Sequence, residues 1–178
     1  MMFVDLNELR EREKPLRIVK EFGDKELKVD NPIGSLRGPV HSEMEVSLWG
    51  ERVHVEGELG ADLVLTCSRC LKFFDRKIQK EFEVEFVPDP VMETEGEEVA
   101  LTYTDLDVGF YRDDGLDVGA VISEQIVLEI PMQPICQKAC KGLCHQCGAD
   151  LNEGDCNCQD QTIDPRFEAL LDLKKRLG

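Results

Sequence analysis

The chain has 178 residues and a formal net charge of −16, and 33% of its residues are charged. This length supports one domain with at most a small appended module. Such strong acidity argues against wrapping nucleic acid by bulk electrostatic attraction. The first residues carry no basic head followed by an apolar run, and no apolar stretch reaches the ~18–20 residues of a membrane span. We therefore expect a cytoplasmic protein with no membrane among its partners.

Alternating apolar and polar residues predict a β-rich front half built from hairpins. One hairpin is expected around a turn at 49–52, because apolar side chains alternate on both of its flanks. The alternation continues into Cys67, and a long strand is expected from Arg76 to Val87. The pair Cys67 and Cys70 would then lie at the tip between two antiparallel strands. Shorter strands are expected at 15–22, 26–29 and 99–103.

The tip of the long hairpin is basic, unlike the rest of the chain. Five basic residues lie between positions 69 and 80, and two phenylalanines lie among them. This combination suits single-stranded RNA, whose phosphates pair with cations and whose bases stack on aromatic rings. A hairpin with a charged outer face and phenylalanines in the core would give the same pattern. The candidate RNA-binding residues are Arg69, Lys72, Phe73, Arg76 and Lys77.

The segment that follows, 88–98, holds two prolines, five acidic residues and no basic residue. It offers little apolar surface to bury, so we expect a mobile, solvent-exposed link. The alternative is an acidic tether for a basic protein partner, or a mimic of nucleic acid. Residues 88–130 carry 12 acidic and 1 basic side chain, so most of the net charge lies in this central region.

Two helices are expected in the second half of the chain. The first has Asp117 as its cap and ends before Pro131, and its apolar residues recur at helical spacing. The second begins at Asp164 and Pro165 and runs to the end of the chain. The expected fold class is α+β. It comprises an antiparallel β-rich body, two helices and a C-terminal cysteine-rich zinc-binding module. The body, with the cysteine arm and the acidic link, is expected at 1–130, and the zinc module, with the second helix, at 131–178.

Eight cysteines in three clusters carry the strongest chemical signal. Two close pairs of thiolates on tight turns are the usual ligands of a structural zinc ion, and eight cysteines complete two such sites. Four disulfides are the rival interpretation, but thiols stay reduced in the cytosol. Redox catalysis at the first C-x-x-C pair is a weaker alternative, because no βαβ unit surrounds it.

The spacing suggests how the cysteines are shared between two zinc ions. The last four lie close in sequence, and the eight residues between their pairs favour turns that let the loop fold back. By exclusion, the remaining four would form a second site that ties distant parts of the chain together. His145 is a possible substitute ligand, but the cysteine count is already complete. The expected sites are Cys144, Cys147, Cys156 and Cys158 (site 1), and Cys67, Cys70, Cys136 and Cys140 (site 2).

No catalytic constellation is evident in the sequence. The chain has neither a phosphate-binding G-x-x-x-x-G-K-S/T loop nor a G-x-S-x-G nucleophile turn, and its three histidines have no motif context. A zinc shell made of four cysteines leaves no open position for water or substrate. We therefore expect structural zinc, no enzyme activity and no small-molecule substrate.

The order of these features resembles the bacterial YceD family, known as large ribosomal RNA subunit accumulation proteins. The resemblance spans nearly the whole chain and is most specific from Cys136 to Asn152, at Cys156-Asn157-Cys158 and at Asp164-Pro165-Arg166. The sequence departs from the family at positions 145 and 150, where proline and asparagine are frequent. Some members lack the second cysteine cluster, so the resemblance implies that the more widely shared pair at 67 and 70 is closer to the common function.

The resemblance implies a role in making or maintaining large-subunit (23S) ribosomal RNA, without a known enzyme activity. We expect a ribosome biogenesis factor whose partner is this RNA or a ribosome assembly or processing protein. The alternative is an acidic adaptor that binds a basic ribosomal protein or RNA-processing factor and never touches RNA. An RNA-processing enzyme with an unrecognised site is a third, weaker hypothesis.

Overall fold

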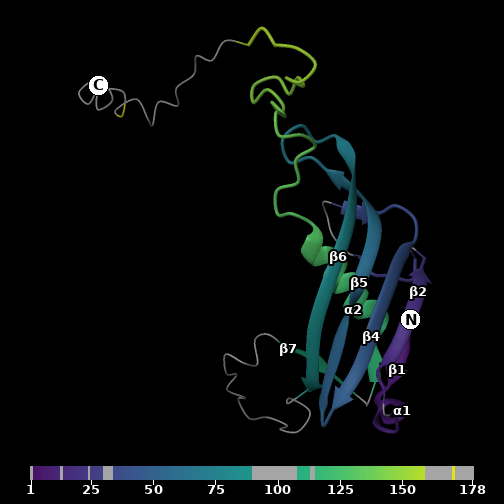
Figure 1. Ribbon diagram of the computed structural model, residues 1–178. Helices are drawn as coiled ribbons and strands as arrows, with labels where there is room; N and C mark the ends of the chain where they lie inside the picture. Colours follow the sequence, from purple (N-terminus) through teal and green to yellow (C-terminus); the bar gives the residue numbers. More distant parts are fainter. Residues whose placement is uncertain are drawn as a thin grey trace.

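A long, curled β-sheet forms the body of the protein, and a cysteine-rich segment lies beyond one end of it (Figure 1). The structure is a computed structural model that describes residues 2–12, 14–23, 25–29, 34–89, 108–112, 115–158 and 170. Residues 90–98 of the acidic link expected at 88–98, the strand at 99–103 and nearly all of the C-terminal helix lie outside these residues. Of the two described residues of the link, Pro88 ends a strand and Asp89 is buried, so this part is not the exposed link that was expected.

The main sheet has the strand order β2-β4-β5-β6-β7, and β3 also pairs with β5. Neighbouring strands are antiparallel except β6 and β7, which are parallel. β4 pairs with the first part of β5 and β3 with a later part, so the two occupy the same side of β5. The strands are β2 (Leu16–Phe22), β3 (Gly34–Leu36), β4 (Val40–Trp49), β5 (Arg52–Thr66), β6 (Phe73–Pro88) and β7 (Val108–Tyr111).

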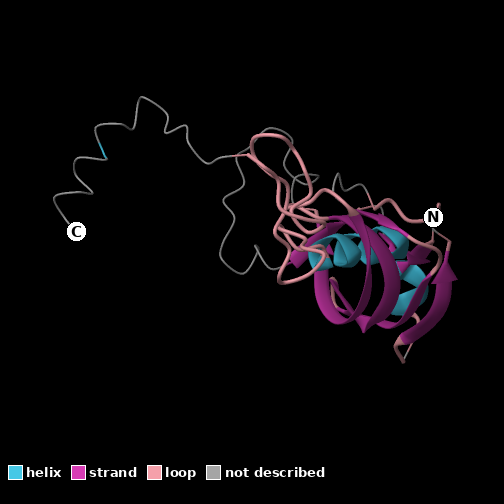
Figure 2. Cartoon of the chain, turned by 90° about the horizontal axis from the view of Figure 1, so that it is seen from above, coloured by secondary structure: helices cyan, strands magenta, loops and turns pink. Residues whose placement is uncertain are grey.

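The helix α2 (Val118–Glu129) lies in the hollow of the curled sheet, as Figure 2 shows. Its Val118, Val121, Ile122 and Ile126 are buried in one core with the inward residues of the sheet. The cap is the predicted Asp117, whose carboxylate accepts hydrogen bonds from the N–H groups of residues 119 and 120. This cap satisfies two of the four free N–H groups at the helix start.

Alternation fixes which face of the sheet is buried. Along β5, the odd-numbered residues from Val53 to Leu65 face the core, and the residues between them face outward. Gly57 is required at one point of this face, because a Cβ atom there would lie 2.4 Å from the carbonyl oxygen of Glu43. The two strands therefore approach each other more closely than a larger residue would allow.

The predicted fold class is confirmed: the body is β-rich and mostly antiparallel, and the hairpin tip between β5 and β6 carries the first cysteine pair. The predicted strand at 26–29 is absent, since these described residues form a turn, a bend and irregular backbone. Five short elements were not predicted. Two are the strands β3 and β7 of the main sheet, and the others are β1 (Phe3–Asp5), α1 (Leu6–Arg10) and β8 (Gly115–Asp117), with β1 and β8 forming a separate two-stranded sheet. The division of the chain at residues 130 and 131 stays a prediction.

Candidate metal centre

The two C-x-x-C turns have the same backbone geometry. In each turn, the residue after the second cysteine donates its N–H to the carbonyl of the first cysteine: Leu71 to Cys67, and Gly148 to Cys144, both at 2.9 Å. The first cysteine donates to the carbonyl five residues further on, at 2.9 and 2.8 Å respectively. Leu71 and Gly148 both have left-handed backbone angles, with φ of 60° and 73°. The turns thus repeat one backbone shape in two places.

The structure gathers the eight sulfur atoms into the same two groups of four that the sequence analysis predicts. We call Cys67, Cys70, Cys136 and Cys140 the hairpin site, and Cys144, Cys147, Cys156 and Cys158 the terminal site. Within each group, all sulfur atoms lie within 4.8 Å of one another. His145 is exposed and belongs to neither group.

Sulfur separations in the hairpin site fit a tetrahedral metal. Cys67 and Cys140 have their sulfurs 3.9 Å apart, and Cys70 and Cys136 have theirs 3.7 Å apart. Four thiolates at ~2.3 Å from a zinc ion would be separated by about 3.8 Å. A disulfide requires ~2.05 Å, and all eight cysteines are free. The residues therefore fit a tetrahedral metal ion such as zinc.

Each site contains one cysteine whose thiol pKa is lowered. Burial raises the pKa of Cys67, but backbone N–H groups of Cys70, Cys136 and Arg69 outweigh burial and lower it to about 6. Backbone N–H groups of Cys147 and Gln146 lower the pKa of Cys144, also to about 6. These donors would stabilise metal-bound thiolates in the same way.

Each site also contains a cysteine whose pKa is strongly raised. Burial, followed by contacts with neighbouring thiols, raises the pKa of Cys136 to about 12. In the terminal site, the contact with Cys147 is the main reason why the pKa of Cys158 rises to about 12. A divalent cation would lower these raised pKa values, because it stabilises the thiolates and displaces the remaining thiol protons.

The cysteine-rich segment is bound to the hairpin tip by its backbone as well as by sulfur. Ser68 donates its N–H and its hydroxyl to the carbonyl of Pro134, at 2.8 and 3.0 Å. Arg69 accepts from the N–H of Leu143 at 3.1 Å, and its guanidinium donates to the carbonyl of Cys140 at 2.9 Å. Gly142 has a φ of 79° and passes so close that a Cβ would lie 3.0 Å from the carbonyl oxygen of Arg69.

Two of the predicted RNA-binding cations are engaged within the protein. The guanidinium of Arg69 holds the Cys140 carbonyl, and the ammonium of Lys72 lies 2.7 Å from Asp150 and also pairs with Glu153. Lys72 lowers the pKa of Asp150 to about 2, with help from the N–H of Asn152. The two carboxylates in turn raise the pKa of Lys72 above its usual range.

The other three candidates are exposed but do not share one face. Phe73 and Lys77 lie on the outer face of β6, whereas Arg76 lies on the opposite face together with Phe74 and Ile78. Phe73 is 77% exposed. Among the residues that the structure describes, the ion pair of Lys77 is a long one, 3.9 Å from Asp62. Phe73 and Lys77 thus share the outer face of β6, and Arg76 lies on the other face.

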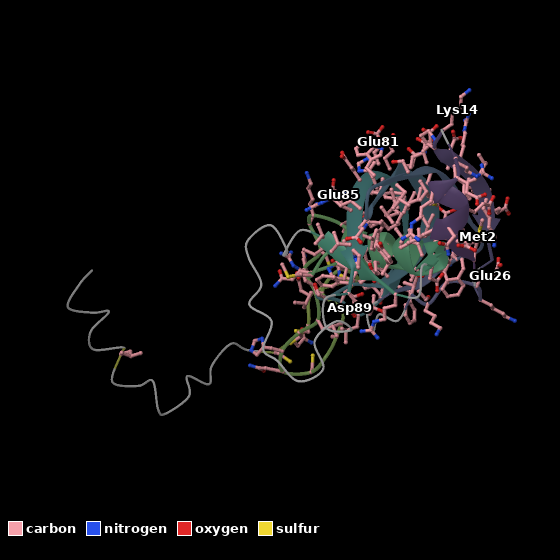
Figure 3. The ribbon with its side chains drawn as sticks, turned by 90° about the horizontal axis from the view of Figure 1, so that it is seen from below. Met2, Lys14, Glu26, Glu81, Glu85 and Asp89 are labelled. Atoms are coloured by element: carbon pink, nitrogen blue, oxygen red, sulfur yellow. The ribbon has the colours of Figure 1, made fainter. Side chains whose placement is uncertain are left out.

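The outer face of the sheet carries a grid of carboxylates that sequence reasoning missed. Glu58 lies directly opposite one glutamate on each neighbouring strand, and Glu56 does the same one row away. Figure 3 shows Glu81 and Glu85 on the outer side of the sheet, away from α2. Alternation predicts only that polar residues face outward on each strand, and the register shows that the acidic ones align. The grid comprises Glu43, Glu45, Glu56, Glu58, Glu81 and Glu83.

Asn152 is a further residue that the sequence analysis did not single out. Its amide lies 3.5 Å from the sulfur of Cys140 and its side-chain oxygen accepts from the N–H of Lys141 at 2.8 Å. The available signal was an Asp-x-Asn turn former placed between two cysteine pairs. Cysteine spacing alone gives no indication that this turn faces the other site.

Taken together, these features define a class: a curled β-sheet protein with two candidate four-cysteine metal sites at one end. A sequence model described as "Large ribosomal RNA subunit accumulation protein YceD" matches residues 55–174. The chain therefore belongs to the YceD family. Within the described part of the chain, no helix is long and apolar enough to cross a membrane.

Three relatives illustrate the similarity. The chain is 25% identical to the chloroplastic YCED homolog 1 of Arabidopsis thaliana over 198 residues, which cover 97% of this chain and 57% of the relative. It is 31% identical to an uncharacterized protein of Mycobacterium tuberculosis strain H37Rv, covering 74% of this chain and 60% of that one. It is 29% identical to the uncharacterized protein YlbN of Bacillus subtilis, covering 78% and 76%. The chain thus spans less than two thirds of the length of the first two, and no solved structure matches it.

Proposed function

We propose that this protein is a non-enzymatic ribosome biogenesis factor that supports the accumulation of large-subunit (23S) ribosomal RNA. Membership of the YceD family carries this proposal, because the family description and the names of the plant relatives both refer to accumulation of this RNA. The two cysteine sites support a structural role for the tip, since four-thiolate shells leave no open position for a reacting molecule.

The proposal includes zinc in both sites. Tetrahedral sets of four thiolates select zinc or iron–sulfur chemistry among biological metals. The hairpin site takes two ligands from the tip of the β5–β6 hairpin and two from residues that follow α2. Metal there would fix the cysteine-rich segment on the sheet and present the exposed side chains beside it in a constant arrangement.

RNA contact through the tip is the mode of action that we propose. Phe73 offers an exposed ring for stacking, and Lys77 is an exposed cation on the same face of β6. Arg76 is exposed on the opposite face of this strand, so RNA would reach it only by passing around the strand edge. Arg69 and Lys72 would contribute by holding the tip in shape, because their charged groups already have partners within the protein. The RNA surface is therefore smaller than the sequence suggests.

A cellular measurement tests the proposed role directly. Cells depleted of this protein should show a lower ratio of large-subunit to small-subunit ribosomal RNA, and the wild-type chain should restore that ratio. An unchanged ratio after complete depletion would refute the role. Restoration by a variant that carries Phe73→Ala and Lys77→Gln would retain the role and refute RNA contact through the tip.

The glutamate grid favours a second candidate, the acidic adaptor. Its six carboxylates face solvent over three strands, and the chain as a whole carries −16. A basic ribosomal protein or processing factor would complement this surface. RNA would be repelled by it. The adaptor would serve the same RNA accumulation without touching the RNA.

Binding measured across a salt series separates the two candidates. If Arg76 and Lys77 pair with phosphates, changing both to Gln should flatten the log–log salt slope by about 1.4–1.8, at ~0.7–0.9 per lost contact. Glu56→Gln with Glu58→Gln should leave RNA affinity equal or higher. The adaptor predicts the reverse: no effect of the cation changes, and weaker capture of a basic partner after the glutamate changes.

A further inference from the structure

The loop that joins the two halves of the terminal site also touches the hairpin site. This loop spans residues 148–155, between the cysteine pairs 144/147 and 156/158. Within it, Leu151 donates its N–H to the carbonyl of Gly142 at 2.9 Å. Asn152 places its side-chain amide 3.5 Å from the sulfur of Cys140, a hairpin-site cysteine. A residue of the loop that closes the terminal site thus lies beside a candidate ligand of the hairpin site.

Lys72 holds the same loop from the side of the sheet. It follows Cys70 by two residues, and its ammonium lies 2.7 Å from Asp150 and also pairs with Glu153. The Asp150 side chain is only 10% exposed, so this ion pair is partly shielded from water. Lys72 therefore connects the strand end that carries the hairpin site to the loop that closes the terminal site.

We infer that Lys72 and Asn152 couple the two cysteine sites, so that metal in either site raises the metal affinity of the other. The inference rests on the proposed zinc sites. Its physical basis is loop closure: the terminal site forms only when 148–155 folds back, and an ordered hairpin site holds that loop in its closed position. Thermodynamic linkage makes the effect reciprocal, with one coupling factor for both directions.

The coupling gives Lys72 a positioning role in place of RNA contact. Its ammonium cannot bind a phosphate without sharing or leaving Asp150 and Glu153. Asn152 has the corresponding role on the opposite side. Its side-chain amide donates to Asp150 at 2.6 Å and lies 3.5 Å from the sulfur of Cys140, while its oxygen accepts from the N–H of Lys141. Outer-shell groups of this kind typically change metal affinity by ~10–100-fold.

The test compares the full chain with Lys72→Met and with a matched control, Lys77→Met. Both changes remove one lysine from the same hairpin. Lys77 is 88% exposed, and its ion pair is long, with 3.9 Å between the ammonium and its carboxylate partner. Zinc is withdrawn by a graded series of chelator concentrations. Cysteines that become free are alkylated and located by mass spectrometry, which reports the two sites separately.

Lys72→Met should lower the zinc affinity of the terminal site by about 10-fold, and that of the hairpin site by a similar factor. Lys77→Met should leave both affinities unchanged. Asn152→Ala is the second variant, and it should weaken retention at both sites even if Lys72→Met fails to fold. Sites that lose zinc independently, with wild-type affinities in the folded variants, would overturn the coupling. A wild-type chain that binds no metal would refute the proposed zinc sites instead.

Discussion

A single left-handed leucine distinguishes the two cysteine turns at the residue scale. Leu71 occupies the position that Gly148 occupies in the terminal site, with a φ of 60° and 61% of its surface exposed. This conformation costs an L-residue roughly 1–2 kcal/mol, and glycine adopts it freely. The sequence thus has leucine at a position where the backbone conformation favours glycine.

We predict that Leu71→Gly changes the free energy of unfolding by less than about 1 kcal/mol, because relief of strain offsets the extra entropy of the unfolded glycine. Leu71→Val should lower it by about 1–3 kcal/mol, since a β-branched residue tolerates this conformation poorly. Denaturant titration of the metal-loaded protein measures both. A loss above 2 kcal/mol in Leu71→Gly would show that the leucine contributes packing that its exposure does not suggest.

At the scale of elements, β4 and β5 approach each other closely at Gly57. A Cβ there would lie 2.4 Å from a backbone oxygen and 2.7 Å from the Cα of Met44, and backbone atoms cannot move aside cheaply. Gly57→Ala should therefore destabilise the protein by about 1–3 kcal/mol. Gly60→Ala is the matched control on the same strand, because the nearest atom to its Cβ would lie 4.0 Å away.

Denaturant titration of these two variants tests how tightly the sheet is packed. Gly60→Ala should be neutral or stabilise slightly, since alanine loses less entropy than glycine in a strand. Equal effects of the two substitutions would contradict the close approach and would mean that the strands separate easily at Gly57.

Sequence patterns predicted some of the elements and missed others. Alternation predicted the β5–β6 hairpin and helical spacing with an Asp cap predicted α2, because each signal is local. The three-residue strands β1 and β8 escaped prediction, since they are held by pairing between distant parts of the chain. Cysteine spacing gave the two groups of four. It could not show that Lys72 faces Asp150, because this contact joins residues 78 positions apart and depends on the docked segment.

At the scale of the whole molecule, the two ends of the protein have different sources of stability. The sheet and α2 share a continuous apolar core, whereas the cysteine-rich segment buries few large apolar side chains. Structural zinc in small modules supplies ~10–16 kcal/mol of apparent binding energy, which would replace such a core. Order at the tip should therefore depend on metal, and order in the sheet should not.

Hydrogen exchange after removal of metal by a chelator tests this division. Backbone amides of residues 134–158 should lose protection, while those of β4, β5 and the adjoining part of β6 should keep it. Cooperative loss of protection over the entire chain would contradict the division and would mean that the sheet also requires the metal.

Metal content is the measurement that tests the central claim most directly. Protein purified under reducing conditions without added metal should contain two zinc ions per chain, by elemental analysis and native mass spectrometry. Cys147→Ser should contain one, because it removes a ligand of the terminal site only. A folded chain with no bound metal, or with disulfides between these cysteines, would contradict the account.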